Sequence, residues 1–176
     1  MAVTFAVRFG GVSEVRGRFS AVEGTLRIPD GDVEGAQVEL RVGASSVCTG
    51  IALRDHHLCG PGFLDAARWP WIIFASNHVL RENGALRVDG SLALHGVTLP
   101  VAVRAPFEFA QGRGLAGNVS FVVDFSVERA VHGIGTGGWR RFNPLNFAIA
   151  RHVHVRAQLL VPATQLLPAL LPALGR

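Results

Sequence analysis

The chain has 176 residues, enough for one domain with a substantial core. Apolar residues make up 49% of it and charged residues 17%, so it must place an apolar excess in a large core, an interface or a lipid-sized cavity. The formal net charge is +4. All basic residues are arginines, scattered without a basic run, which argues against nucleic-acid binding and excludes chemistry through a lysine Schiff base.

The amino-terminal residues carry no visible signal for export. The chain opens MAVTFAVRF, which alternates like a strand and has no charged region followed by an apolar one. We therefore expect a cytoplasmic protein as the sequence stands, or a periplasmic or secreted one if a leader has been removed. No apolar run approaches the roughly 20 residues of a transmembrane helix. Cys48 and Cys59 are too few for a disulfide framework, and whether they pair stays open.

Strands dominate the expected secondary structure. Apolar side chains recur at every second position through most of the chain, as in strands with one apolar and one polar face. Turn-forming pairs such as Gly10-Gly11, Asn83-Gly84 and His95-Gly96 separate these segments. The pattern predicts about eight strands, at residues 3–9, 15–28, 36–44, 71–79, 85–96, 98–109, 118–129 and 149–161.

One stretch between the third and fourth of these strands is helical in character. It spans residues 53–67, and Gly60-Pro61-Gly62 would split it into two short turns. Eight antiparallel strands form either a sandwich or a barrel, and strands of this length favour a barrel with an apolar interior.

Three ordered motifs follow one another at compatible spacings. Residues 49–58 read TGIALRDHHL, residues 62–76 read GFLDAARWPWIIFAS, and residues 90–101 read GSLALHGVTLPV. Through these motifs the chain resembles the YceI-like family of lipocalin-like, polyisoprenoid-binding proteins, from about Thr4 to Val161. The late part of the family pattern is kept only at Arg129 and Gly133, which leaves the identity of the ligand open.

The resemblance implies an all-β fold, an eight-stranded antiparallel lipocalin-like β-barrel with a short helical segment between strands three and four. Residues 1–162 would form the lipid-binding barrel and residues 163–176 a Leu/Pro-rich tail, for which docking on its own barrel is favoured over a neighbour or a membrane surface. The barrel would bind or carry an isoprenoid, an isoprenoid quinone or a fatty-acid-like lipid in its lumen. The resemblance implies no catalytic residue, metal or cofactor.

The apolar faces of the strands supply the candidate ligand-binding residues. Burial of a chain-like ligand contributes roughly 25 cal/mol of binding free energy per Å² of apolar surface, so an apolar lumen can bind it with few polar contacts. With Arg129 as a polar contact, we expect the ligand to touch Phe5, Val7, Phe9, Phe19, Val38, Leu40, Val42, Ile72, Phe74, Leu92, Leu94, Val101, Val103, Phe121, Val123 and Phe125.

Two other functions stay open at this point. A pocket enzyme, a cyclase or isomerase acting on a hydrophobic metabolite, would use Arg54, His57 or Arg129. An interaction module or homodimer would use Trp71, Ile73 and the tail, because alternation points Trp71 and Ile73 outward as an apolar patch.

Three further patterns have a plain explanation that we favour. The Arg54-Asp55-His56-His57 cluster is an acid-base site or, more simply, a structural turn that closes the barrel. His152 and His154 share one strand face but have no evident third metal ligand. The glycine-rich stretch from Gly133 and the following Trp139-Arg140-Arg141 form a loop over one mouth, with arginines that would meet a lipid head group or simply be solvated.

Overall fold

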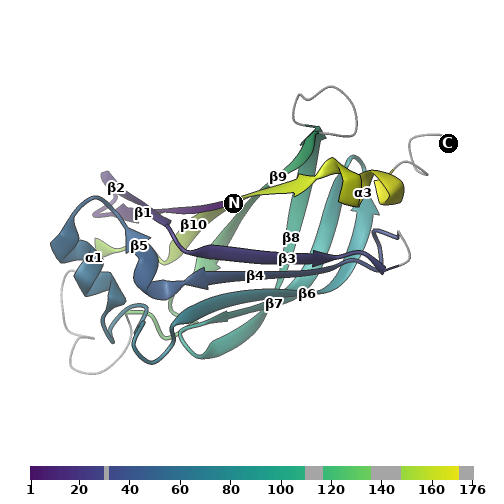
Figure 1. Ribbon diagram of the computed structural model, residues 1–176. Coiled ribbons are helices and arrows are strands. Elements are labelled where there is room, and N and C mark those ends of the chain that lie inside the picture. Colours follow the sequence, from purple (N-terminus) through teal and green to yellow (C-terminus); the bar gives the residue numbers. More distant parts are fainter. Residues whose placement is uncertain (30–31, 110–116, 136–147, 171–176) are drawn as a thin grey trace.

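The structure is a computed structural model that describes residues 1–29, 32–109, 117–135 and 148–170. Its main element is a ten-stranded antiparallel sheet that curls into a half-barrel (Figure 1). The strands are β1 (Ala2–Phe9), β2 (Ser13–Phe19), β3 (Val22–Arg27), β4 (Gln37–Gly43), β5 (Val47–Cys48), β6 (Trp71–Glu82), β7 (Ala85–Leu94), β8 (Val97–Phe109), β9 (Asn118–Glu128) and β10 (His152–Pro162).

The strand order along the sheet is β3-β4-β6-β7-β8-β9-β10-β1-β2-β5. Tight turns join β6, β7 and β8, at Asn83-Gly84 and at His95-Gly96, and all four of these residues have positive φ. Two-residue hairpin turns of this conformation match the twist of the strands that they join. The first and last strands pair with each other, with Val3 opposite Ala157, so segments far apart in the sequence share one wall.

The predicted strand at residues 15–28 is two strands, because the chain bends at Ser20 and Ala21. The Ala21 amide donates to Ser46 Oγ at 3.0 Å, and the Gly43 amide donates to the Ala21 carbonyl at 2.9 Å. As a result β2 pairs with β1 and β5, whereas β3 pairs with β4. The predicted count of eight strands is therefore wrong, and β5 is the other strand that it missed.

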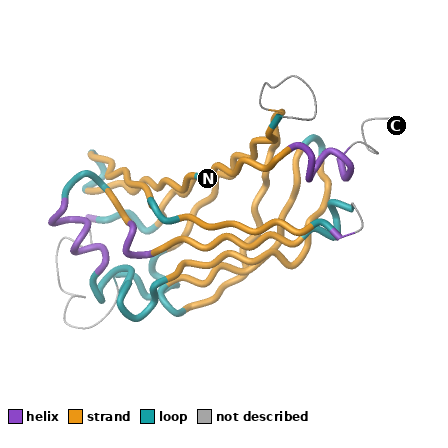
Figure 2. The backbone as a smooth tube through the Cα atoms, in the orientation of Figure 1, coloured by secondary structure: helices purple, strands orange, loops and turns teal. Residues whose placement is uncertain are grey.

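Two helices lie at opposite ends of the strands, α1 (Ala52–Cys59) after β5 and α3 (Ala163–Leu170) after β10 (Figure 2). In the stretch 53–67 that was predicted to be helical, the helix ends at Cys59. Hydrogen-bonded turns follow it as far as Trp69. Because two strands were missed, α1 lies between the fifth and sixth strands rather than the third and fourth. Within the described residues, no helix is both long enough and apolar enough to span a membrane.

Buried apolar side chains from the strands and from the segments next to them form two clusters. The large cluster consists of Val3, Val33, Ala36, Val42, Val79, Leu86, Val88, Ala105, Val119, Phe121, Val123, Ala157, Ala163 and Leu166. The small cluster consists of Leu92, Leu94, Val127 and Ile134.

Candidate ligand cavity

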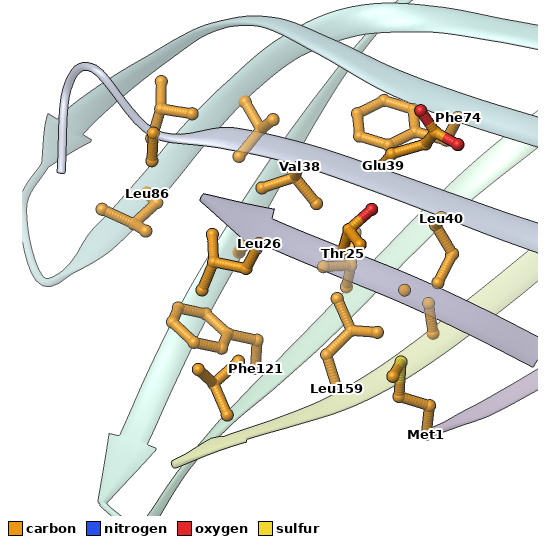
Figure 3. A pocket seen from close by; sticks show the side chains of 18 of the residues that line it. Met1, Thr25, Leu26, Val38, Glu39, Leu40, Phe74, Leu86, Phe121 and Leu159 are labelled. Atoms are coloured by element: carbon orange, nitrogen blue, oxygen red, sulfur yellow. The ribbon is translucent and has the colours of Figure 1, made fainter. Parts of the chain in front are cut away.

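A cavity of about 260 Å³ lies inside the half-barrel and reaches α3. Its wall is almost entirely apolar and is built from side chains of seven strands, β3, β4 and β6 to β10. Figure 3 shows Leu26, Leu40, Leu159 and Phe121 around the hollow. Among the described lining residues, Glu39 has the one ionisable side chain, and it is exposed.

The register of neighbouring strands brings small side chains to the same level of the wall. Leu86 of β7 lies opposite Ala105 of β8, and Val123 of β9 lies opposite Ala157 of β10. Because alanine and valine reach only a short way from the backbone, opposite walls do not meet across the interior at this level. A void remains that a well-packed core would not contain.

Two short segments close the cavity at its α3 end. Val33 and Ala36 come from the turn between β3 and β4, and Ala163 and Leu166 come from α3. Val33 and Leu166 are each 1% exposed, and the Ala163 amide donates to the Gly117 carbonyl at 2.9 Å, which fixes the start of α3. For these residues the expected docking of the tail on its own barrel is confirmed. The predicted division between barrel and tail stays a prediction.

Two phenylalanines bound the cavity on the side toward α1. Phe74 of β6 and Phe125 of β9 both line the cavity and pack against the small cluster. Beyond them the interior is filled by that cluster together with Phe63 and Leu64, which follow α1. We call the region around the cavity the hollow end and the region of the small cluster the packed end.

The mouth of the cavity lies between β3 and β10. The pairing of β1 with β10 stops at Ala2 and Gln158, so the rest of β10 extends past the end of β1. The Met1 side chain covers Gly24 of β3, close to this end of β1. Exposed lining residues form the rim, namely Met1, Thr25, Glu39, Leu160, Pro162 and Gln165.

The predicted contact residues divide into two groups. Those that line the cavity are Val38, Leu40, Phe74, Val103, Phe121, Val123 and Phe125. The cavity lining does not include Phe5, Val7, Phe9, Phe19, Val42, Ile72, Leu92, Leu94, Val101 or Arg129.

Some lining residues escaped the sequence prediction. Val79, Leu86 and Leu159 follow the same alternation as the predicted positions, so the signal for them was present. Val33 and Leu166 lie outside the strands, and no alternation points to them.

The Arg129 side chain joins two backbone segments by hydrogen bonds at the packed end. Its guanidinium donates to the backbone carbonyls of Ile134, Ile149 and Ala150, each at 3.1 Å. Burial lowers the pKa of this guanidinium from its ordinary value. Buried His132 lies nearby in sequence and makes a 3.3 Å hydrogen bond from Nδ1 to the Val97 carbonyl, a contact that the sequence did not suggest.

The Arg54-Asp55 motif builds the turn before α1. Asp55 accepts hydrogen bonds from the Thr49 amide at 2.8 Å and from the Thr49 hydroxyl. Arg54 donates to Thr49 Oγ1 at 2.7 Å and to the Thr49 carbonyl at 2.9 Å. His57 contacts Phe63 edge-on, with ring centroids 5.1 Å apart. These contacts give the motif a structural role, the stabilisation of this turn. None of its residues lines the cavity.

Trp71 and Ile73, which were predicted to form an outward-facing apolar patch, do not pack on either core cluster. Both side chains are only partly exposed, and the Arg41 guanidinium lies over the Trp71 ring, 4.5 Å from its centroid. On the opposite wall His154 faces outward and hydrogen-bonds Ser126 at 3.0 Å. Across the described ranges, no three His, Cys, Asp or Glu side chains are grouped as metal ligands.

A second, wider depression of about 1050 Å³ lies over β1, β2, β5, β9 and β10, and Phe5 and Phe125 are among the residues that line it. Its walls carry opposite charges that pair at the surface, Arg16 with Glu14 and Arg156 with Asp124. The hydrogen bond from Arg16 and then its charge lower the pKa of Glu14. This mixed, open surface lacks the apolar enclosure of the cavity.

The loop predicted to cover a mouth falls mainly on residues 136–147. Trp139, Arg140 and Arg141 therefore lie outside the described residues, as do residues 171–176 of the tail.

Known proteins are similar to this chain in sequence or in fold. The sequence matches the YceI-like domain over residues 1–160. It is 36% identical over 105 residues to a UPF0312 protein of Shewanella denitrificans, which covers 59% of this chain and 55% of the relative. It is 34% identical over 103 residues to Protein YceI of Salmonella paratyphi B, covering 58% and 54%. The matched region thus spans little more than half the length of these relatives.

Two solved structures share the fold at low sequence identity. BcnA of Burkholderia cenocepacia has a TM-score of 0.78 and 17% identity, covering 91% of this chain and 95% of that one. A polyisoprenoid binding domain of Saccharophagus degradans has a TM-score of 0.68 and 18% identity, covering 92% of both chains. With the motifs, the curled sheet and the family match over residues 1–160 in agreement, the chain belongs to the YceI-like family.

Proposed function

We propose that this protein binds or carries an apolar, chain-like ligand, an isoprenoid, an isoprenoid quinone or a fatty-acid-like lipid, in the cavity between Phe74 and Leu166. The observation that carries the proposal is the apolar void itself, since a folded interior normally leaves none of this size. The likeness to a polyisoprenoid binding domain supports the same class of ligand.

The size of the cavity limits the part of the ligand that it encloses. An engineered apolar cavity of about 150 Å³ takes one benzene, so in proportion this cavity takes about ten carbon atoms. Each buried methylene contributes about 0.8 kcal/mol, or about 8 kcal/mol for such a chain before the opposing cost of association, roughly 4–15 kcal/mol. We therefore expect modest affinity for a short chain, and a longer chain to leave the cavity through the mouth.

The polar groups at the rim favour a neutral head group. Thr25 and Gln165 offer hydrogen bonds, and Glu39 carries a negative charge that would repel a carboxylate or phosphate. No arginine contributes to the described part of the lining. An alcohol or a quinone could therefore be hydrogen-bonded at this mouth.

The proposal assigns no reaction to the cavity. Arg54 and Arg129 use their guanidinium groups on backbone and hydroxyl oxygens, and His57 packs on Phe63. None of these three side chains lines the cavity. They therefore cannot serve there as the acid or base that a cyclase or isomerase would need.

Replacement of two alanines of β8 by phenylalanine, one inside the cavity and one outside it, tests the proposal. Ala105 is buried and lines the cavity, so Ala105→Phe should fill it; Ala102 is exposed on the same strand, so Ala102→Phe should leave it open. We expect decan-1-ol to bind the wild type and Ala102→Phe equally in calorimetric titration, and Ala105→Phe at least tenfold more weakly. Native mass spectrometry of the mildly purified protein should also find a copurified lipid. Unchanged decan-1-ol binding by a folded Ala105→Phe protein would contradict the proposal.

A further inference from the structure

Phe74 stands at the boundary between a hollow and a filled region of one continuous apolar interior. Its side chain lines the cavity and packs against the small cluster of the packed end. In Figure 3 it lies on the far side of the hollow from Leu86. On β6 it precedes Val79 by five positions, and Val79 lines the cavity while Phe74 closes it.

The position of the ring depends on a glycine in the next strand. Gly90 of β7 lies under Phe74, and a Cβ at Gly90 would be 2.8 Å from Phe74 Cε2. A Cβ at position 90 would come closer still to the backbone carbonyl oxygen of Ala75, so a larger residue there would disturb the pairing of β6 with β7 as well as the ring. The pair of Phe74 and Gly90 therefore places an aromatic ring across the interior at this level.

The region beyond the ring is apolar as well. Leu92, Leu94 and Val127 are buried there. A chain that passed Phe74 would thus meet apolar side chains of the small cluster, and the ring of Phe74 occupies the space that a longer chain would need first.

We propose that Phe74 sets the length of chain that the cavity encloses, at about ten carbon atoms, by the same proportion to a benzene-sized cavity as above. This inference rests on the proposed function, because it assumes that the cavity holds a chain. Removal of the ring leaves a space of about benzene size, so Phe74→Ala should enclose about six further carbon atoms.

Native mass spectrometry with an equimolar mixture of n-alkan-1-ols from C8 to C16 tests the proposal. For the wild type we expect occupancy to rise with chain length up to about C10 and then to level off, since each enclosed methylene adds about fourfold to the affinity. For Phe74→Ala we expect the rise to continue to about C16, with at least a tenfold gain for C16 over C8 relative to the wild type. Phe74→Leu, which keeps an apolar side chain and more of the stability, should shift the plateau by fewer carbons.

Phe63→Ala is the matched control, because it removes the same atoms from a ring that packs on the small cluster without lining the cavity. Its length profile should equal that of the wild type. An unshifted profile in folded Phe74→Leu and Phe74→Ala, or an equal shift in Phe63→Ala, would overturn the role of Phe74 while leaving the proposed function intact. A wild type that takes up no alkanol of any length would overturn the proposed function itself, and this inference with it.

Discussion

The hollow end and the packed end are built by the same strands with the same alternation, yet one encloses a void and the other does not. At the packed end, residues from connecting segments enter the interior, Phe63 and Leu64 from the turns after α1 and Ile134 from the segment after β9. At the hollow end, Val33 and Leu166 close the end of the half-barrel, and the strands contribute mostly short side chains. The comparison teaches that connections, rather than strands, decide which part of this interior is filled.

The largest expected difference between the two ends concerns two leucines of one strand. Leu86 and Leu92 lie on β7 and are 6% and 7% exposed, but Leu86 lines the cavity whereas Leu92 belongs to the small cluster and does not line it. We expect Leu92→Ala to lower the free energy of unfolding by about 3–4 kcal/mol, since it creates a new cavity, and Leu86→Ala by about 2 kcal/mol, since it mainly loses the transfer term. Urea denaturation of both variants measures the difference. Equal losses would mean that the void closes in solution.

A second test concerns the hydrogen bonds that Arg129 donates to backbone carbonyls at the packed end. Arg129→Met should lower the free energy of unfolding by about 2 kcal/mol, because three backbone carbonyls lose their donors. Arg151→Met is the control, since Arg151 is exposed and, within the described part of the chain, its side chain pairs with Glu128 at the surface. Decan-1-ol binding should be unchanged in both variants. A loss of binding in Arg129→Met alone would restore Arg129 as a ligand contact.

Many residues of the cavity wall could be predicted from the sequence. The division of the interior into a hollow end and a packed end could not. Alternation placed Val38, Leu40 and Phe121 correctly on the cavity wall, because side-chain direction in a strand follows from sequence position alone. The bend at Ser20 escaped, since it depends on hydrogen bonds to residues about 25 positions away. The roles of Val33 and Leu166 escaped for a similar reason, as both reach the cavity from segments outside the strands.

Hydrogen exchange should distinguish the two ends more finely. With decan-1-ol present, backbone amides of β7 around Leu86 and Val88 should exchange more slowly, whereas those around Leu92 and Leu94 should change little, because a guest stabilises most strongly the elements that it contacts. Uniform slowing over both ends would indicate that ligand binding stabilises the fold as a whole, and no slowing around Leu86 would place the guest elsewhere.

The smallest expected effect concerns Cys59 at the end of α1. Burial and then the negative charge of Asp55 raise the pKa of this thiol, so less of it is thiolate near neutral pH. Alkylation by iodoacetamide at pH 8 should therefore be slower than for a free cysteine in a peptide, and it should not respond to decan-1-ol. Because the folded pKa is raised, the linked stability is present below the unfolded pKa and is lost as pH rises through the folded pKa. Fast alkylation of the native protein would contradict this environment.

The most direct measurement is a crystal structure of the protein saturated with decan-1-ol. We expect a single decan-1-ol chain inside the half-barrel, in contact with Phe74 and Leu86 and with its hydroxyl toward Thr25 and Gln165. A side-chain-filled interior, or a guest bound only in the outer depression over β1 and β10, would contradict it.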